Sequence, residues 1–412
     1  MRFWSMYNPS MRILLLNLYY PPDTSATAKM AETVVHALAR EHQVTIVCGR
    51  PSYDPSERRT WRLWQTEKYN GVSIVRVGST DYPRFSMKKR ALNYLTYSAL
   101  VIPRALFMRC DAVLAMTDPP FQGIIGAIVA TLKRKPYIYN IRDMYPDMAI
   151  GGGLMANSLF TRIWEKLHRW ALRRANCVIV LGEDMRSRII SKGVLAERIE
   201  IVRDGADFSA HSKDQVDPEI VAQIRSGFRF VLVHAGNLGF YGDWDALLEV
   251  ARDLQKDDPE IGMVFIGEGA QKKRLEAAAA GMRNVRFLPF FPANKIPSVL
   301  AAADAHLVTV KQGLEGVVVP SKMYGILAAG KPMLGLAPEW SEVQRIVKAA
   351  DCGYVDCPLD GLEEFTEMVR RLSRDPERVQ RMGKAALAAA PAYDRVKELE
   401  KFARIVGRSR SR

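Results

Sequence analysis

Long hydrophobic runs are missing from this chain of 412 residues. No segment approaches the about 18 consecutive apolar residues that a membrane-spanning helix needs, so we expect none. The opening MRFWSMYNPS is too short and too polar for a signal peptide, and we interpret residues 1–10 as an extension ahead of the folded part. Both absences favour a protein that stays in the cytoplasm.

Groups of metal-binding residues are also missing. The five cysteines stand at 48, 110, 177, 352 and 357, and the six histidines show no HxxxH-type grouping. No two cysteine pairs occur at the spacing of a metal site. We therefore expect no zinc site, and we predict reduced, mostly buried thiols.

Acidic residues are too few to balance the basic ones. There are 45 Asp and Glu against 59 Lys and Arg, which gives a net charge of +14. Such a charge suits nucleic acid, an anionic membrane or a phosphorylated substrate. Aromatic residues are not interleaved with the basic ones as they are on RNA-binding surfaces, so we expect no nucleic-acid partner.

Two basic segments have amphipathic patterning, at 87–109 and 162–174. A helix of this kind can lie on an anionic bilayer. The alternative for each segment is a helix that packs into the core and presents a solvated basic face. Because both occur in one basic chain, we predict an anionic membrane surface as a partner and leave the alternative open.

The first half of the chain alternates apolar runs with helical patterns. A helix is expected around 29–40, and the apolar runs, which predict buried parallel strands, stand at 12–18, 42–48, 72–77, 111–116, 137–143 and 177–182. The loop after the first run has no GxGxxG, which disfavours a dinucleotide cofactor. The pattern predicts a doubly wound α/β domain over residues 11–207.

The second half repeats this pattern after a polar, proline-containing linker near 208–219. Strands are expected at 228–239, 262–269, 285–290 and 305–310, with helices at 244–255 and 271–280. We predict a second α/β domain over 208–391, a final helix at 392–406 that crosses back onto the first domain, and a loose basic tail at 407–412. Two doubly wound sheets would then face each other across a cleft.

The stretch at 311–332, KQGLEGVVVPSKMYGILAAGKP, predicts a loop and a helix entered through Pro320 and Ser321 and closed by Gly330. A helix N-terminus with Lys322 in its first turn suits an anion. Glu315, just before, can accept hydrogen bonds from hydroxyls. A site that binds both a phosphate and the hydroxyls of a polyol indicates a nucleotide-sugar. Alone, the stretch also fits an ordinary capped surface helix.

Further polar residues follow other expected strands. Gly236 and Asn237 form a turn in which amides can approach a phosphate. Arg142 and Asp143 end a first-domain strand, where Asp143 either takes or orients the proton of an incoming hydroxyl or caps the next turn. The DxD pattern Asp243-Trp244-Asp245 is better explained as the first turn of a helix than as a metal site.

Three residues of the first domain are candidates for the acceptor side of the cleft. Thr24 and Ser25 either contact an acceptor or cap the following helix. Asp118, in TDPP, ends another strand, and a rigid turn is the alternative there.

Several motifs together are similar to one known family. They are RILLLNLYYPPDTSATAKM near the start, RDGAD at 203–207, VHAGNLG at 233–239, FIGEG at 265–269 and VVVPSKMYGILAAGKP at 317–332. From Met11 onward the chain resembles the retaining family 4 glycosyltransferases of GT-B fold. NIRDMYPD and GLEGVVVPSK most resemble the O-antigen and capsule sub-group that includes L-fucosamine transferases.

This resemblance implies a nucleotide-sugar held mainly by the second domain, and transfer without a metal ion or a cofactor. It implies catalytic roles for Arg142, Asp143, Glu315 and Lys322. The implied donor contacts are Gly236, Asn237, Gly267, Phe290, Gly316, Val317, Ser321 and Lys322, with the base near 287–290. The family's two glutamates fall at Val317 and Gly325, and its basic diphosphate contacts are replaced here by Lys322.

The resemblance predicts transfer of an N-acetylated deoxyhexosamine from a UDP-sugar to a polyprenyl-diphosphate-linked saccharide. The reaction would take place at the cytoplasmic face of the membrane, in O-antigen or capsule synthesis. A UDP-sugar 2-epimerase of the same fold is the alternative enzyme. A non-catalytic membrane-associated scaffold is the alternative without catalysis.

Overall fold

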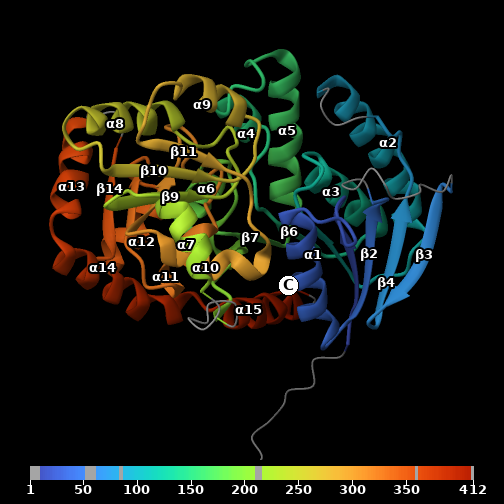
Figure 1. Cartoon of the computed structure of the whole chain (residues 1–412). Helices are drawn as coiled ribbons and strands as arrows, with labels where there is room; N and C mark the ends of the chain where they lie inside the picture. Colours follow the sequence, from blue (N-terminus) through green and yellow to red (C-terminus); the bar gives the residue numbers. More distant parts are fainter. Residues whose placement is uncertain (1–9, 52–61, 83–86, 209–215, 358–360, 410–412) are drawn as a thin grey trace, which may run out of the picture.

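The computed structural model describes residues 10–51, 62–82, 87–208, 216–357 and 361–409. Two α/β domains stand side by side, and the last helix runs beneath both (Figure 1). This is the predicted architecture of two Rossmann-like domains. It has the GT-B arrangement.

The first domain is built on a sheet of eight strands within the described residues, in the order β3-β4-β2-β1-β5-β6-β7-β8. Its strands are β1 (Arg12–Leu16), β2 (Gln43–Gly49), β3 (Trp64–Tyr69), β4 (Val72–Val77), β5 (Ala112–Ala115), β6 (Tyr137–Asn140), β7 (Cys177–Val180) and β8 (Ile199–Ile201). Its helices are α1 (Ala26–Ala39), α2 (Met87–Leu106), α3 (Gln122–Lys133), α4 (Asp147–Gly151), α5 (Leu159–Arg174) and α6 (Glu183–Ser191). The central strands are parallel and apolar because helices cover both faces.

The second domain has a six-stranded sheet in the order β11-β10-β9-β12-β13-β14, counted over the described residues. Its strands are β9 (Phe230–Ala235), β10 (Ile261–Ile266), β11 (Val285–Leu288), β12 (Ala305–Thr309), β13 (Met333–Leu336) and β14 (Gly353–Asp356). Its helices are α7 (Pro218–Arg225), α8 (Trp244–Asp257), α9 (Lys272–Ala278), α10 (Ile296–Ala302), α11 (Lys322–Ala328), α12 (Glu342–Ala350), α13 (Glu363–Ser373) and α14 (Pro376–Ala389).

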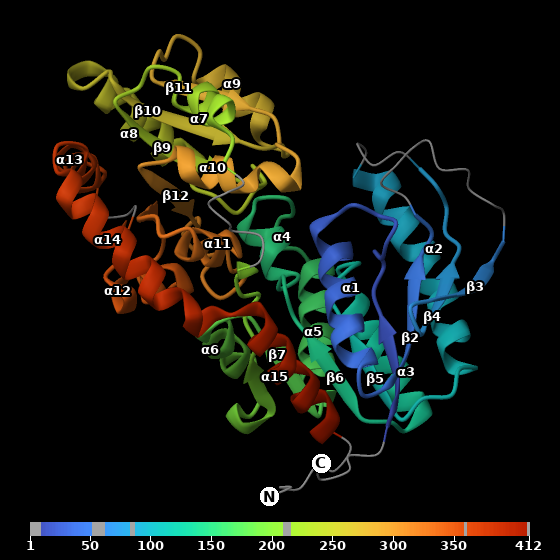
Figure 2. The same ribbon diagram turned by 60° about the horizontal axis from the view of Figure 1, so that its bottom comes forward.

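The final helix α15 (Arg395–Arg408) returns to the first domain. Figure 2 shows it lying across the junction toward α1. Its residues Phe402 and Val406 belong to the same hydrophobic cluster as Ile13 of β1. The helix extends through Arg408, so residues 407 and 408 are helical and the predicted tail is wrong there. Residues 1–9 and 410–412 lie outside the described residues.

Direct contacts tie the two domains together at their junction. Asp143 and Val318 form an antiparallel bridge, and the amide of Met144 donates to the carbonyl of Val317 over 3.0 Å. On the other side of the junction, the Asp184 carboxylate of α6 accepts the amide of Glu342 of α12 over 2.9 Å. The contacts of Asp143 and Met144 fix the loop before α11 against the first domain, and the bond from Glu342 fixes the start of α12 there.

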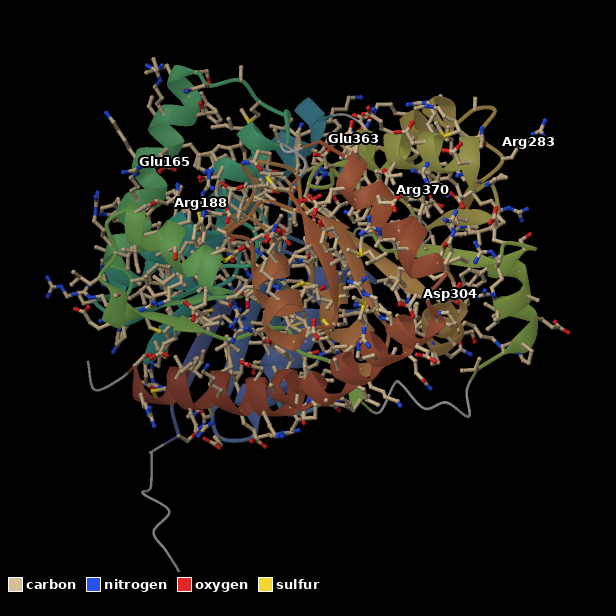
Figure 3. The ribbon with its side chains drawn as sticks, turned by 90° about the vertical axis from the view of Figure 1, so that its left-hand side faces the viewer. Glu165, Arg188, Arg283, Asp304, Glu363 and Arg370 are labelled. Atoms are coloured by element: carbon tan, nitrogen blue, oxygen red, sulfur yellow. The ribbon has the colours of Figure 1, made fainter. Side chains whose placement is uncertain are left out.

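An ion-pair cluster joins α4, α5 and α6 behind this loop. The buried ammonium of Lys192 lies 2.8 Å from carboxylate oxygens of both Asp147 and Glu165. Arg188 donates to Asp147 over 3.1 Å and to the carbonyl of Glu315 over 2.9 Å. Figure 3 labels Glu165 and Arg188 on this side of the molecule. The cluster therefore supports the loop that carries Glu315.

No helix in the described part of the chain is both long and apolar enough to cross a membrane.

Candidate active site

A cavity of about 340 Å³ opens between the two domains. The second domain contributes Gly236, Ser321 and Lys322 to its lining. Asp204, which follows β8, and Arg395, at the start of α15, line it from the junction. It therefore meets residues from both halves of the fold, beyond the carboxyl ends of the second domain's strands, where doubly wound sheets bind ligands.

Lys322 is the first residue of α11. Part of its side chain faces the cavity, and its ammonium lies 2.9 Å from both ring nitrogens of His234. It forms no ion pair with any carboxylate of the described residues. Burial lowers the pKa of Lys322 to about 7. The cavity thus contains a desolvated amine that no carboxylate of the described residues pairs with, and its charged form favours an anionic ligand.

His234 ends the apolar run of β9 and is fully buried. Its ring packs edge-on against Trp244, with ring centroids 4.7 Å apart. Burial, together with the nearby Lys322 charge, lowers the pKa of His234 well below its ordinary value. The neutral imidazole can therefore accept a hydrogen bond from the lysine without competing for its charge.

The turn after β9 has the close packing that glycine allows. Gly236 lines the cavity, and its carbonyl oxygen would lie 1.9 Å from a Cβ added at Gly267. Gly267 is therefore required for the approach of two loops. Asn237 is exposed and outside the cavity lining, and its carbonyl accepts the hydroxyl of Tyr241 over 2.7 Å. Of the three predicted contacts in this region, Gly236 lines the cavity, whereas Asn237 and Gly267 lie outside its lining.

Two positions on the apolar wall of the cavity are relevant to the nucleoside. Phe290 is 54% exposed and lines the cavity with Ile266 and Ile296. Gly325 of α11, at the position of the family's second glutamate, also lines it. The position of the family's second glutamate therefore lies on the cavity, as the resemblance implies, but Gly325 has no carboxylate.

Gly316 and Val317 lie outside the lining of this cavity. The amide of Gly316 donates to the Asp184 carboxylate over 3.2 Å, and a Cβ there would meet the Asp184 carbonyl at 2.5 Å. Val317 is fully buried. Their backbone groups serve the domain junction, because the first domain supplies the bonding partners. Next to them, one carboxylate oxygen of Glu315 is buried and makes no hydrogen bond with the described residues.

Arg142 and Asp143 follow β6 at the cleft. Arg142 forms an ion pair with Asp204, which lines the cavity. Burial raises the pKa of Asp143 to about 6, and the nearby Asp118 carboxylate adds to the rise. Asp143 also raises the pKa of the Tyr241 hydroxyl in the second domain, after the larger effect of burial. Its carboxylate therefore lies between the domains and can accept a proton near neutral pH.

The acceptor-side candidates have different environments. Ser25 is buried and caps α1, because its hydroxyl accepts the amide of Ala28 over 3.1 Å. Its hydroxyl is therefore used by the helix, as the capping alternative predicts. Thr24 is exposed. Asp118 precedes a cis peptide bond, its carbonyl accepts the amide of Leu18 over 2.7 Å, and its carboxylate acts on Asp143.

The DxD pattern stands at the start of α8, as predicted. Asp245 forms an ion pair with Arg274 over 2.6 Å. Across the described residues no three His, Cys, Asp or Glu side chains gather as potential metal ligands.

Sequence reasoning missed the residues that reach the cavity from distant parts of the chain. Asp204 and Arg395 lie far from Lys322 in sequence, and the fold alone brings them together. The RDGAD motif contains Asp204 and was a usable signal. His234 resembles an ordinary buried strand residue, and only its contact with Lys322 distinguishes it.

Comparisons with known proteins agree with this arrangement. Residues 25–205 match the family model described as Glycosyl transferase 4-like domain, and residues 218–388 match the model described as Glycosyl transferases group 1. WcaI of Escherichia coli, named as a colanic acid biosynthesis glycosyl transferase, is 24% identical over 352 residues, which are 82% of this chain and 86% of that protein.

Two solved structures share the whole fold. HepE of Anabaena, in complex with UDP-glucose, has a TM-score of 0.68 at 17% identity, covering 96% of this chain and 99% of that one. WaaG, a glycosyltransferase involved in lipopolysaccharide biosynthesis, has a TM-score of 0.68 at 17% identity with the same coverage. Since both halves of the chain are matched in order, the chain belongs to the glycosyltransferases of GT-B fold. Its first domain is a glycosyl transferase 4-like domain, and its second domain belongs to the glycosyl transferases group 1.

Proposed function

We propose that the protein transfers a sugar from a UDP-sugar to a lipid-linked saccharide in the synthesis of a cell-surface polysaccharide. Retention of the anomeric configuration and independence of metal ions and cofactors are parts of this proposal. The donor sugar proposed is an N-acetylated deoxyhexosamine, and the acceptor carrier is a polyprenyl diphosphate. Both follow from the resemblance of NIRDMYPD and GLEGVVVPSK to the fucosamine transferase sub-group.

The observation that carries the proposal is the position of Lys322. When the donor reacts, the bond between its anomeric carbon and the diphosphate oxygen breaks, and negative charge develops on the leaving diphosphate. Lys322 supplies a cation that no carboxylate of the described residues neutralises, beside the Gly236 turn in the cavity. Such fixed charge in a desolvated site stabilises the departing group, which is electrostatic preorganisation.

Two carboxylates fit the sugar side of the reaction. The acceptor oxygen bonds to the anomeric carbon and must lose its proton. The Asp143 carboxylate can receive or orient that proton, because it lies between the domains and has a pKa of about 6. Glu315 has a buried oxygen without a hydrogen-bond partner in the described residues, which can accept a donor-sugar hydroxyl. Arg142, held by Asp204, would be next to both substrates.

The relatives support UDP and a polysaccharide setting. HepE was solved with UDP and with UDP-glucose, WaaG is described as acting in lipopolysaccharide biosynthesis, and WcaI is named for colanic acid biosynthesis. The cavity agrees in size and polarity with part of such a donor. It joins an apolar wall, at Phe290, to a cation at Lys322.

Peripheral binding to the cytoplasmic face of the membrane is proposed from helix α5. Leu159, Ile163, Leu167 and Trp170 form an exposed apolar stripe along it, with exposures of 75%, 50%, 46% and 37%. A parallel row of exposed cations runs beside the stripe, formed by Arg162, Lys166, Arg169 and Arg173. An anionic bilayer complements both rows, since the apolar side chains enter the interface and the cations meet the headgroups.

The first test is a screen of UDP-, GDP- and dTDP-sugars for thermal stabilisation, since a ligand that binds only the folded state raises its apparent stability. UDP-sugars should stabilise the wild type selectively. Lys322→Met should remove this effect and transfer activity. Lys331→Met is the matched control, because Lys331 is also part-buried but bonds the carbonyls of Ala301 and Ala303 outside the cavity. Full UDP-sugar stabilisation in the Lys322 variant would contradict the diphosphate assignment.

Product analysis separates this proposal from its rivals. Conversion of a UDP-sugar without any acceptor would favour the 2-epimerase. Absence of nucleotide binding by calorimetry would favour a scaffold. The anomeric coupling constant of the transferred sugar, measured by NMR, tests retention.

A further inference from the structure

An arginine stands on the inward face of helix α2. Arg90, Tyr94, Tyr97, Val101 and Ala105 follow one another at helical spacing, and the last three are fully buried in the first domain's core. Arg90 and Tyr94 are partly buried at the end of this row. A charged residue at such a position is unusual and needs a partner or a function.

Among the described residues, Arg90 has a hydroxyl group as its hydrogen-bond partner instead of a carboxylate. Its Nε donates to the Tyr94 hydroxyl over 2.5 Å, and that hydroxyl lies 3.3 Å from the hydroxyl of Tyr19. Arg90 forms no ion pair within the described chain. By contrast, the more deeply buried Arg76 contacts Glu67 over 2.6 Å. Among the described residues, therefore, no carboxylate neutralises the positive charge of Arg90.

This cluster stands at the cleft edge of the first domain. Tyr19 follows β1, Asp118 follows β5, and Tyr145 follows β6, so all three lie beyond the carboxyl ends of parallel strands. Burial and the carboxylates of Asp143 and Asp118 raise the pKa of the Tyr145 hydroxyl, while Arg90 lowers it. Tyr145 is therefore within electrostatic reach of both Arg90 and the carboxylate proposed to meet the acceptor.

The tyrosine rings suit a saccharide. Tyr145 stacks in parallel with Trp164, with ring centroids 5.9 Å apart, and this contact holds the ring in place. Flat aromatic faces pack against sugar rings, and phenol hydroxyls exchange hydrogen bonds with sugar hydroxyls. A guanidinium in the same cluster adds a forked donor that matches the geometry of phosphate and carboxylate.

We propose that Arg90, with Tyr19, Tyr94 and Tyr145, forms an acceptor subsite that binds a negatively charged oxygen group of the acceptor. The group is either a phosphate of the lipid carrier or the carboxylate of an acidic sugar. The inference rests on the proposed function, because it names the acceptor chemistry for the same cleft. The counter-ion of Arg90, which has no carboxylate partner among the described residues, would then arrive with the substrate.

The test uses the full chain and three ligands with the same alkyl group: octyl phosphate, octyl β-glucuronide and octyl β-glucoside. Calorimetry should show that wild type binds one of the two anions at least tenfold more tightly than the neutral glucoside. Arg90→Met should lose this preference, and Arg90→Lys should keep part of it. Lys89→Met is the matched control, because Lys89 is exposed, next in sequence, and 5.9 Å from the Tyr82 ring centroid.

Tighter binding of octyl phosphate identifies the lipid carrier as the source of the anion, and tighter binding of the glucuronide identifies an acidic sugar. Equal binding of all three ligands, or an unchanged preference in a folded Arg90→Met variant, overturns the subsite. UDP titrations of the same samples separate this inference from the donor assignment. UDP binding without Arg90-dependent anion binding rejects the subsite alone, whereas the reverse result rejects the donor site and retains the anion site.

Discussion

The affinity for a UDP-sugar should fall as the pH rises through 7. The charged form of Lys322 attracts the diphosphate, and burial lowers the pKa of this lysine to about 7. The ammonium is then present in about nine tenths of molecules at pH 6 and in about one tenth at pH 8. Since an apparent dissociation constant varies inversely with the competent fraction, it should rise about tenfold over this range, or about 1.4 kcal/mol.

UDP-glucose is a suitable probe, because both of its phosphates keep a fixed charge over this range. Calorimetry at pH 6, 7 and 8, repeated in two buffers of different ionisation enthalpy, measures affinity and proton uptake together. About one proton should be taken up per UDP-glucose bound at pH 8, and almost none at pH 6. Lys322→Met should bind weakly, without pH dependence. The reasoning is refuted if the affinity for UDP-glucose stays the same from pH 6 to pH 8 and no proton is taken up at pH 8.

The same lysine gives a second readout that needs no ligand. Between pH 7 and its ordinary pKa, the unfolded chain keeps a proton on Lys322 that the folded chain has lost. Stability therefore rises with pH in this window, because the unfolded state binds more protons. The difference in unfolding free energy between the wild type and Lys322→Met should move in favour of the wild type from pH 7 to pH 9, as measured by urea denaturation.

Three shorter predictions test other parts of the site. Asp143→Asn should lower turnover about 10²- to 10⁴-fold, while UDP binding persists. The wild-type rate should fall below pH 6, where the Asp143 carboxylate gains a proton, and this fall should be absent in the variant. Replacing Ile163 and Leu167 by Glu should reduce co-sedimentation with anionic vesicles, whereas Leu387→Glu, at a similarly exposed site on α14, should not. Chelation by EDTA should leave transfer unchanged, because Asp245 of the DxD pattern is paired with Arg274; loss restored by manganese would contradict this.

The fold was predictable because its central strands are buried on both faces. Continuous apolar runs such as RILLL and FVLVHA are stable mainly as strands covered on both faces. The helices between them follow from the helical periodicity of their apolar residues. One strand that was missed, β3, differs in kind. β3 reads WQTEKY, and no residue in it is buried, since it pairs antiparallel at the edge of the sheet. Its position depends on β4, and its own sequence gives little sign of it.

The candidate site was predictable only where one segment supplies it. The Lys322 segment carries its own helix start and cation, and both line the cavity with Gly236. Ser25 shows the limit of such local reasoning. A hydroxyl before a helix serves equally well as a cap or as a ligand contact in sequence, and the bond to Ala28 decides for the cap.

What sequence reasoning could not find is the absence of a counter-charge. Lys322 lies in the second domain and Arg90 in the first, and each contacts a neutral side chain, whereas the buried Arg76 meets a carboxylate. Leaving a cation unneutralised at low exposure costs stability in the free protein. Two such costs in one cleft are explained if both substrates bring negative charge, the donor at its diphosphate and the acceptor at the group that Arg90 binds. A neutral acceptor would leave the second cost without a function, and for this reason the octyl glucoside comparison tests the interpretation of the whole cleft.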